Sequence, residues 1–368
     1  MRRYGWAPVF LALLLITGLL ARCLANDRPI VASYGGTLYW PAWGNAPVPP
    51  AAPDWAVWPP VPYRASATDL SEPAYQPPLA GAHVLGTDGL GRDTLAGLIN
   101  GSRVSVLVGL GSLFVSLLVG LPLGAVAGFF GNGGLRASRA GLVALLVGLP
   151  LGFAYAGASL LPLVGFGFRF LLMFLLVSVV AVSAVWLLLL PLRRRWPALS
   201  RSVGVPVDGG VLLVLEMAAS IPGLVLLIAL LAFVDHPPLS LLILVIGLLS
   251  WTPVARFLRA ELLRVRELPY IAAARMSGVG EFRLLVRHAL PNALGPVGVV
   301  AAFMVGTSIL AEAMLSFLGI GVPVGEVTWG SMLQQSRLEP QAWWLAVFPG
   351  LLLTFTVLAC NSLRRGPT

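Results

Sequence analysis

The fold is decided by a polar, arginine-bearing stretch that begins Ala273-Ala274-Arg275-Met276-Ser277-Gly278 and ends Arg287-His288-Ala289-Leu290-Pro291-Asn292. It lies between two long apolar runs, and a charged loop of this length between such runs indicates a surface on which another protein docks. Gly278 is expected to end one helix, and Pro291 is expected to stop a second. The small side chains of Ala273 and Ala274 would let another protein surface come close. The pattern predicts a helix–turn–helix that serves as a docking element.

The composition around this stretch is that of a membrane protein. Hydrophobic residues make up 58% of the 368 residues, the mean hydropathy is +0.88, and 11% of the residues are charged. That charged fraction is about half of the ~25% found in globular proteins. One soluble core cannot enclose so much apolar sequence. We therefore expect an all-α polytopic membrane protein.

The positive charge comes entirely from arginine, because the chain contains no lysine. A nucleotide-binding P-loop needs its lysine to contact phosphate, so this chain holds none. ATP, Mg²⁺ and any ATP hydrolysis therefore belong to a partner, and no cofactor is expected in this chain. The net charge of +9 is compatible with nucleic-acid binding, but most arginines fall in short loops between apolar runs. We expect no nucleic-acid partner.

Eight apolar runs approach the ~20 residues that a membrane-spanning helix needs. They cover residues 6–24, 104–130, 141–163, 166–191, 210–234, 239–255, 293–318 and 343–361. If the N-terminus lies inside, the ends and loops on the cytoplasmic side hold 17 of the 24 arginines. These loops include the docking stretch, 256–292, and a short tail, 362–368. The arrangement agrees with the positive-inside rule and predicts a multi-pass protein whose docking element faces the cytoplasm.

Residues 1–25 are expected to form an anchor helix that is retained. Met1-Arg2-Arg3 followed by an apolar run also fits a signal peptide, and Leu20-Ala21-Arg22-Cys23 is close to a lipoprotein cleavage site. However, Arg22 stands where a small residue is needed, and the run is long for a signal. Cys23 and Cys360 lie near opposite chain ends, so neither a disulfide nor a metal framework is expected.

Residues 26–100 form one long extramembrane segment, which the topology places outside. Eleven prolines and four tryptophans fall between Trp40 and Pro78. Prolines at this density oppose regular helix and sheet interiors, whereas the aromatic residues oppose free disorder. Two alternatives stay open, a compact loop-rich cap at the membrane interface and a loose proline-rich spacer.

A cluster of polar and glycine residues precedes the second apolar run. It contains His83, Gly86, Thr87, Asp88, Gly91, Arg92 and Asp93. The two aspartates flank Arg92 in a glycine-punctuated turn, so these charges are expected to pair with one another or with a docked binding protein. Thr87 or Asp88 is expected to cap the helix that follows. A structural role is favoured over a catalytic one.

Two acidic residues fall inside or at the edge of apolar runs, where charge is costly enough to imply a purpose. Glu216 lies in LEMAASIPGL, where Pro222 is expected to kink the helix, and Glu312 lies in ILAEAMLSFLGIGVP. Both are candidates to line a polar pathway. The alternative is an interhelical hydrogen bond or ion pair, for which Arg169 is available. No catalytic residue is predicted, because the chain lacks HExxH, GxSxG and paired His/Asp clusters.

The stretch RAELLRVRELPYIAAARMSGVGEFRLLVRHALPNA, residues 259–293, resembles the coupling loop of ABC-importer permeases of the peptide/nickel family. In that family the loop docks into a cleft of the ATPase subunit. The glutamate that names the family motif is absent, since Ala272 stands in its place. The resemblance implies that the coupling contacts fall on Glu267, Tyr270, Ala273, Ala274, Arg275, Gly278, His288, Leu290 and Pro291.

Other segments extend this resemblance over about 25–130 and 205–361. The cluster from His83 to Asp93 is similar to the HPLGTDxxGRD signature of C-type peptide permeases. ANDRPIVASYGGTLYWP and WAVWPPVPY resemble the outer segment of the Yej-type subgroup of peptide permeases. The runs around Glu216 and Glu312 are similar to the family's E…SIP and TEASLSFLGLG segments.

An apolar insertion, 141–191, departs from the family pattern and is long enough for two extra helices. The resemblance then implies an ABC type I importer-like permease bundle of about eight transmembrane helices, with a six-helix core and the extra pair, over residues 101–361. An even number of extra helices keeps the downstream orientation unchanged. The coupling loop therefore still faces the cytoplasm.

The resemblance implies the permease subunit of an ATP-driven importer in the cell inner membrane. Its expected partners are a second homologous permease, two ATPase subunits or domains and a periplasmic substrate-binding protein. Movement would follow alternating access, in which the ATPases push the docked loop. Peptides are the favoured solute, although the sequence does not identify it. Nickel or another solute is the alternative within the family, and a secondary transporter or channel is the alternative outside it.

Overall fold

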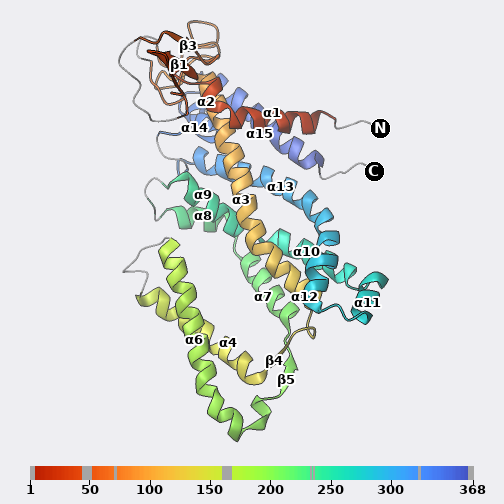
Figure 1. Cartoon of the computed structure of the whole chain (residues 1–368). Coiled ribbons are helices and arrows are strands. Elements are labelled where there is room, and N and C mark those ends of the chain that lie inside the picture. Colours follow the sequence, from red (N-terminus) through yellow and green to blue (C-terminus); the bar gives the residue numbers. More distant parts are fainter. Residues whose placement is uncertain are drawn as a thin grey trace.

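The computed structural model describes residues 5–43, 52–69, 73–159, 168–232, 234, 237–321 and 325–363. Its central element is α3 (Thr94–Phe130), a helix of 37 residues. Figure 1 shows α3 running from the region of β1 and β3 at the top of the view down to α12. The helices that pack around it are α1 (Trp6–Leu19), α7 (Val207–Ser220), α9 (Leu239–Leu249), α10 (Thr252–Val265) and α13 (Leu290–Phe317). The prediction of a helical membrane fold is confirmed.

Close packing between α3 and α10 follows from glycines spaced four residues apart on α3. A Cβ atom at Gly124 would lie 2.7 Å from the Ala255 carbonyl oxygen, and one at Gly128 would lie 2.6 Å from the Arg259 carbonyl oxygen. Only glycine lets the two backbones approach this closely, as at other small-residue interfaces between membrane helices. One apolar cluster, the bundle core, therefore forms along the second half of α3, and two further clusters lie along its first half.

Among the described residues, six helical segments are long and apolar enough to cross a membrane. The pair α7 and α8 (Gly223–Leu231) is bent by 72° and makes a seventh if it is one span. The bend lies at Pro222, as expected. The remaining predicted span, 6–24, is shorter in the structure, because the run breaks at Leu20 into α1, of 14 residues, and α2 (Ala21–Leu24). The tail 362–368 lies mostly outside the described residues.

The span predicted at 239–255 is longer in the structure. Helices α9 and α10 form one apolar segment from Leu239 to Val265, since Pro253 lies in the first turn of α10 and does not interrupt it. Several arginines assigned to the loop 256–292 therefore lie on a helix. Beyond it follow α11 (Pro269–Met276), α12 (Glu281–Leu284), the π-helical turn η2 (Leu285–Ala289), α13, α14 (Trp329–Leu338) and α15 (Trp344–Leu363).

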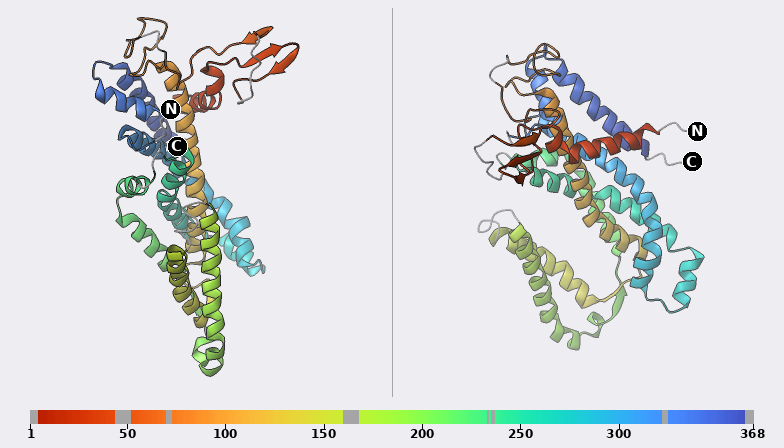
Figure 2. Two further views of the ribbon diagram at one scale, coloured as in Figure 1. Left: turned by 90° about the vertical axis from the view of Figure 1, so that its left-hand side faces the viewer. Right: turned by 45° about the horizontal axis from the view of Figure 1, so that its top comes forward.

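The predicted insertion is a hairpin of two helices, α4 (Arg139–Ser159) and α6 (Phe168–Arg195), followed by the short turn η1 (Pro197–Leu199). The two helices pack mainly on each other, and Figure 2 shows them standing apart from the bundle. Strand β4 (Arg136–Ser138) pairs antiparallel with β5 (Ser202–Gly204), with Ala137 opposite Val203. This ribbon joins the two ends of the insertion, so the end of α3 and the start of α7 come together.

The outer segment contains regular structure that the proline content argued against. Strands β1 (Val31–Tyr34), β2 (Thr37–Tyr39) and β3 (Trp55–Val57) form an antiparallel sheet in the order β2-β1-β3. Ala32 pairs with Tyr39 on one side and with Ala56 on the other. The described prolines lie outside these strands, which is why they do not interrupt the ladder. Among the described residues, the segment is a small folded cap with exposed tryptophans at Trp40, Trp43, Trp55 and Trp58.

Candidate docking segment and transport pathway

The docking segment, residues 266–292, is a helix–turn–helix as predicted. Helix α11 ends at Met276, and Gly278, two residues later, turns the chain with a φ of +80°, a conformation that favours glycine. The Val279 N–H donates to the Ala274 carbonyl at 3.2 Å, and the Gly278 N–H donates to the Arg275 carbonyl at 3.1 Å. This pair of hydrogen bonds is a Schellman motif. It fixes the angle at which the chain leaves α11.

The inner face of the docking segment is held by the bundle core. Ile271 of α11 and Leu284 of α12 are fully buried and belong to one apolar cluster with Phe129 of α3 and Leu262 of α10. Burying each of these side chains stabilises the fold by about 2 kcal/mol. The segment is therefore a rigid extension of α3, α10 and α13, through which displacement of its surface reaches the spanning helices.

Polar contacts brace the two sides of the turn. The Arg275 Nε donates to Glu281 Oε1 at 2.6 Å, and its Nη2 donates to Glu281 Oε2 at 3.1 Å. These hydrogen bonds raise the pKa of the Arg275 guanidinium further above its usual value. Asn292 Nδ2 lies 3.0 Å from the Tyr270 hydroxyl oxygen, which ties α11 to the start of α13. Arg275 and Tyr270 thus stabilise the segment itself.

The outer face of the segment is exposed and includes large apolar side chains. Ala273 is exposed, whereas Ala274 packs partly against the chain's own core, so only Ala273 is free for close approach by another protein. Met276 is 90% exposed and Phe282 is 74% exposed, which is unusual for such side chains in a well-packed segment. Sequence reasoning missed these two residues. The sequence did contain a signal, because neither residue is three or four positions from the buried Ile271 or Leu284 and so neither lies on the same helix face.

The second helix does not stop at Pro291, which corrects the prediction. Helices α12 and α13, joined by η2, form one segment from Glu281 to Phe317. In η2 the Leu290 N–H donates to the Leu285 carbonyl, which ends that register of hydrogen bonds. Pro291 follows in the first turn of α13, where a missing N–H is tolerated.

The remaining predicted coupling residues lie in or beside the same segment. Leu290 packs against the bundle core, and the carbonyl of the half-buried His288 accepts from Asn292 Nδ2 at 2.7 Å. Glu267 is exposed and pairs with the neighbouring Arg266 at 3.0 Å. The Glu267 side chain is 73% exposed.

The cluster from His83 to Asp93 is buried at the other end of α3. Arg92 Nε lies 2.7 Å from Asp88 Oδ2, and both side chains are nearly enclosed, at 11% and 6% exposed. The Asp88 Oδ1 also accepts from the backbone N–H of Leu90 and of Arg92, each at 2.9 Å. The charges therefore pair with one another, and they are not presented to a docked protein.

The helix cap and the long-range contacts of this cluster differ from the prediction. Asp93, and neither Thr87 nor Asp88, caps α3, because its Oδ1 accepts from the Ala96 N–H at 2.6 Å. Its Oδ2 lies 2.8 Å from His83 Nδ1. The Thr87 hydroxyl accepts from the Gln76 N–H, and the Thr87 carbonyl accepts from Trp344 Nε1 at 3.1 Å. The cluster thus fastens the outer segment to the starts of α3 and α15.

The two glycines of the cluster sit where a side chain has no room. Gly86 and Gly91 both have positive φ, +79° and +72°. A Cβ atom would lie 2.3 Å from the Gln76 carbonyl oxygen at Gly86 and 2.5 Å from the Asp69 carbonyl oxygen at Gly91. Each turn therefore requires glycine for its conformation and for its surroundings.

The two acidic pathway candidates have opposite surroundings. Glu216 of α7 is 71% exposed and pairs with Arg256 of α10 at 3.1 Å, so it lies on a face that this chain leaves open. Glu312 is fully buried and accepts from the Ser316 hydroxyl at 2.7 Å, so it lines no open surface. The described ion pair of Glu216 is with Arg256; the side chain of Arg169, the partner considered from the sequence, lies outside the described ones. In the part of the chain that the structure describes, no three His, Cys, Asp or Glu side chains gather as metal ligands would.

Comparison with known proteins gives a match to one family model. Residues 196–365 match the family model described as "Binding-protein-dependent transport system inner membrane component". The match begins directly after α6 ends at Arg195, so it covers the chain after the inserted hairpin.

Relatives of known description extend the comparison. A putative peptide transport system permease protein of Brucella suis is 39% identical over 154 residues, which cover 42% of this chain and 52% of that protein. The match thus spans about half the length of that relative. A putative peptide permease protein of the same organism is 29% identical over 315 residues, 83% of this chain and 77% of that protein.

A third relative is also described as a peptide permease. The di/tripeptide transport system permease protein DppC of Pseudomonas aeruginosa is 29% identical over 284 residues, which cover 77% of this chain and 69% of that protein. In its helical fold and in these matches, the chain is similar to inner membrane components of binding-protein-dependent transport systems.

Proposed function

We propose that this protein is the permease subunit of an ATP-driven importer of peptides. The observation that carries the proposal is the exposed outer face of the docking segment, where Ala273, Met276 and Phe282 project from a base that Ile271 and Leu284 bury in the bundle. A surface that is apolar outside and rigidly held inside suits a partner that both binds it and pushes it. Separate ATPase subunits bind ATP and Mg²⁺ and hydrolyse the ATP, and this chain contributes movement and no catalysis.

The proposed assembly contains a second, homologous permease, two ATPase subunits or domains and a binding protein that delivers the solute. Exposed apolar side chains on α7 and α8, among them Met217 and Val225, and the open ion pair of Glu216 with Arg256 support a pathway formed between two permeases. ATP-driven closure of the ATPases displaces α11 and α12, and the bundle alternates between inward-open and outward-open states. The named relatives are the basis for peptides as the solute, and nickel is the alternative.

The test is Ala273→Glu in the complete importer. Ala273 is exposed in this chain, so its replacement leaves the fold intact but places an unpaired charge in the contact with the ATPase, which costs several kcal/mol. We expect uptake of a labelled tripeptide to fall at least about tenfold, since ~1.4 kcal/mol corresponds to a factor of ten, with normal abundance in the membrane. Ala198→Glu, on the exposed turn η1, is the matched control and should transport normally.

Two outcomes would contradict the proposal. Normal uptake by Ala273→Glu would show that no ATPase docks on this face. Normal peptide uptake in cells that lack the chain, together with loss of nickel uptake, would assign the metal to this importer in place of peptides.

A further inference from the structure

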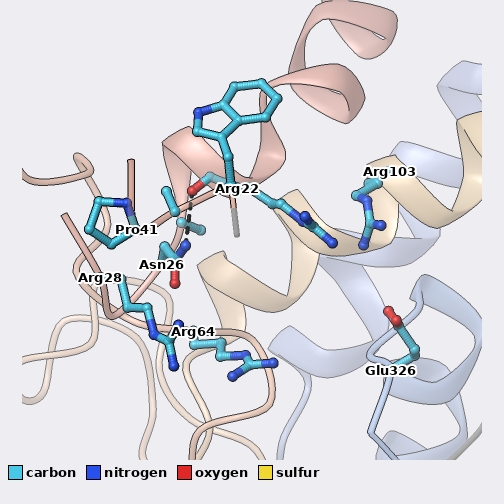
Figure 3. Close-up of a pocket in the computed structure, with 10 residues that line it drawn as sticks. Arg22, Asn26, Arg28, Pro41, Arg64, Arg103 and Glu326 are labelled. Atoms are coloured by element: carbon cyan, nitrogen blue, oxygen red, sulfur yellow. Dashed lines mark hydrogen bonds between the residues drawn. The ribbon is translucent and has the colours of Figure 1, made fainter. Parts of the chain in front are cut away.

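A basic pocket lies at the end of α3 opposite the docking segment. It is a hollow of about 300 Å³ whose lining includes Arg22, Arg28, Arg64, Arg103 and Glu326. The arginines come from four places along the chain, which are α2, the loop before β1, the loop after β3 and α3. Figure 3 shows these side chains around one hollow, with Glu326 on the side of Arg103.

The four arginines of the basic pocket have no acidic partner among the described residues. Each of the eight ion pairs found there involves other side chains. Glu326 also lies in the pocket, but its described contact is with Asn100 Nδ2 at 3.5 Å. Four positive charges against one negative charge leave the hollow electropositive. Because arginine does not lose its proton in proteins, this positive charge is present at any physiological pH.

The position of these arginines in the whole chain is unusual. Seven of the 24 arginines fall outside the predicted cytoplasmic loops and ends. Of these, Arg92 pairs with Asp88, and Arg337 lies over the Phe317 ring at 5.4 Å. The side chain of Arg169 is not described. The other four are those of the basic pocket. The arginines without an acidic partner at this end of α3 therefore lie around one hollow.

The height of Arg103 on α3 indicates which anion reaches the pocket. Helix α3 has 37 residues and is about 55 Å long, whereas the hydrocarbon core of a bilayer is ~30 Å thick. Arg103 lies about 14 Å along α3, which is where a helix centred in the bilayer leaves the hydrocarbon and meets the headgroups. Below it, Leu107, Leu110, Phe114 and Leu118 form an exposed apolar stripe at intervals of three and four residues, on the face that carries Arg103.

We propose that the basic pocket binds the phosphodiester headgroup of an anionic membrane lipid, with an acyl chain along the stripe from Leu107 to Leu118. Guanidinium groups recognise phosphate through paired, charge-assisted hydrogen bonds. A hollow of about 300 Å³ is at the lower end of the range for small-ligand sites, which suits a headgroup. A lipid bound here would join α2, α3 and the outer cap through one ligand.

The experiment compares two lipids with identical acyl chains, phosphatidylglycerol and phosphatidylcholine, added to the full-length chain in detergent. Native mass spectrometry counts the lipid molecules that stay bound. We expect one tightly held phosphatidylglycerol and no equivalent phosphatidylcholine. The double variant Arg64→Gln/Arg103→Gln should weaken retention at least about tenfold through the loss of charge-assisted hydrogen bonds. Glu326→Gln, which removes the acid of the pocket, should strengthen it.

The matched control is Arg337→Gln, because this exposed arginine lies at the same end of the molecule but outside the pocket; it should retain phosphatidylglycerol normally. Size-exclusion profiles and unfolding midpoints in phosphatidylcholine confirm that each variant is folded. Equal retention of the two lipids, or normal retention by the double variant, would overturn the proposal. Inorganic phosphate at millimolar concentration distinguishes the two ligands. If it displaces the lipid completely and raises the unfolding midpoint as much as the lipid does, the ligand is soluble phosphate and the lipid assignment is wrong.

Discussion

At the scale of single residues, Gly86 and Gly278 have nearly the same backbone conformation but different surroundings. Their φ angles are +79° and +80°. A Cβ atom at Gly86 would lie 2.3 Å from the Gln76 carbonyl oxygen, whereas at Gly278 no other heavy atom lies within 4 Å. The first site therefore combines backbone strain with a steric clash, and the second has backbone strain alone.

We predict that Gly278→Ala lowers the free energy of unfolding by about 1 kcal/mol, because the left-handed conformation is strained for alanine. Gly86→Ala should lose a further 1–3 kcal/mol, roughly the usual cost of overpacking. Unfolding midpoints of the two purified variants in the same detergent measure the difference. Equal losses at the two positions would show that the Gln76 carbonyl moves away freely and that the cluster is looser than the structure indicates.

Single residues also show which features a local sequence pattern can predict. Gly278 was predictable as a helix end, because its left-handed conformation is a local property of glycine. The orientation of Ala273 outward and of Ala274 toward the core was not, since both alanines fit either face. Asp88 and Arg92 looked like a surface pair, and only the packing of α14 and α15 over them encloses the pair.

At the scale of elements, α4 and α6 are held together by a stripe of small residues. Ala140, Ala144, Gly148, Gly152 and Ala156 are buried at intervals of four residues. A Cβ atom at Gly148 would lie 2.5 Å from the Val182 Cα atom. Large apolar side chains such as Leu146 and Phe153 point away from α6 and are exposed. In a bilayer, where apolar side chains gain little by leaving lipid, such close packing drives helix association.

We predict that Gly148→Leu separates α4 from α6, whereas Gly157→Leu does not, because a Cβ atom at Gly157 meets no neighbour within 4 Å. Spin labels at Leu146 and Leu187, both exposed, report the distance between the helices once Cys23 and Cys360 are replaced. Gly148→Leu should broaden and lengthen the distance distribution. An unchanged distribution would mean that the hairpin is held by its β4–β5 base alone.

At the scale of the whole molecule, the inserted hairpin packs apart from the helix bundle. Strands β4 and β5 pair Ser138 with Ser202, which places the two ends of the insertion opposite each other. Outside this base, α4 and α6 make few contacts with the bundle. The family match also begins after the hairpin. The hairpin therefore packs as a unit of its own.

We predict that residues 139–201 can be replaced by Asn-Gly without loss of insertion or uptake. Two residues of this type form the tight turn that joins antiparallel strands, so the ribbon stays closed. Membrane abundance and peptide uptake measure the result. A control that also removes β4 and β5 should lower membrane abundance, because paired strands no longer hold the end of α3 beside the start of α7. Loss of uptake at normal abundance in the first variant would give the hairpin a role in transport.

The sequence by itself determined that this is a helical membrane protein with a docking helix–turn–helix and a charged cluster before α3. These features rest on local composition, on turn chemistry and on the length of apolar runs, which act over a few residues. Tertiary structure decided which faces stay exposed, which charges pair and how the insertion closes. It also brought Arg22, Arg28, Arg64 and Arg103 to one pocket. Burial and pairing depend on neighbours that are distant along the chain, so no local pattern specifies them.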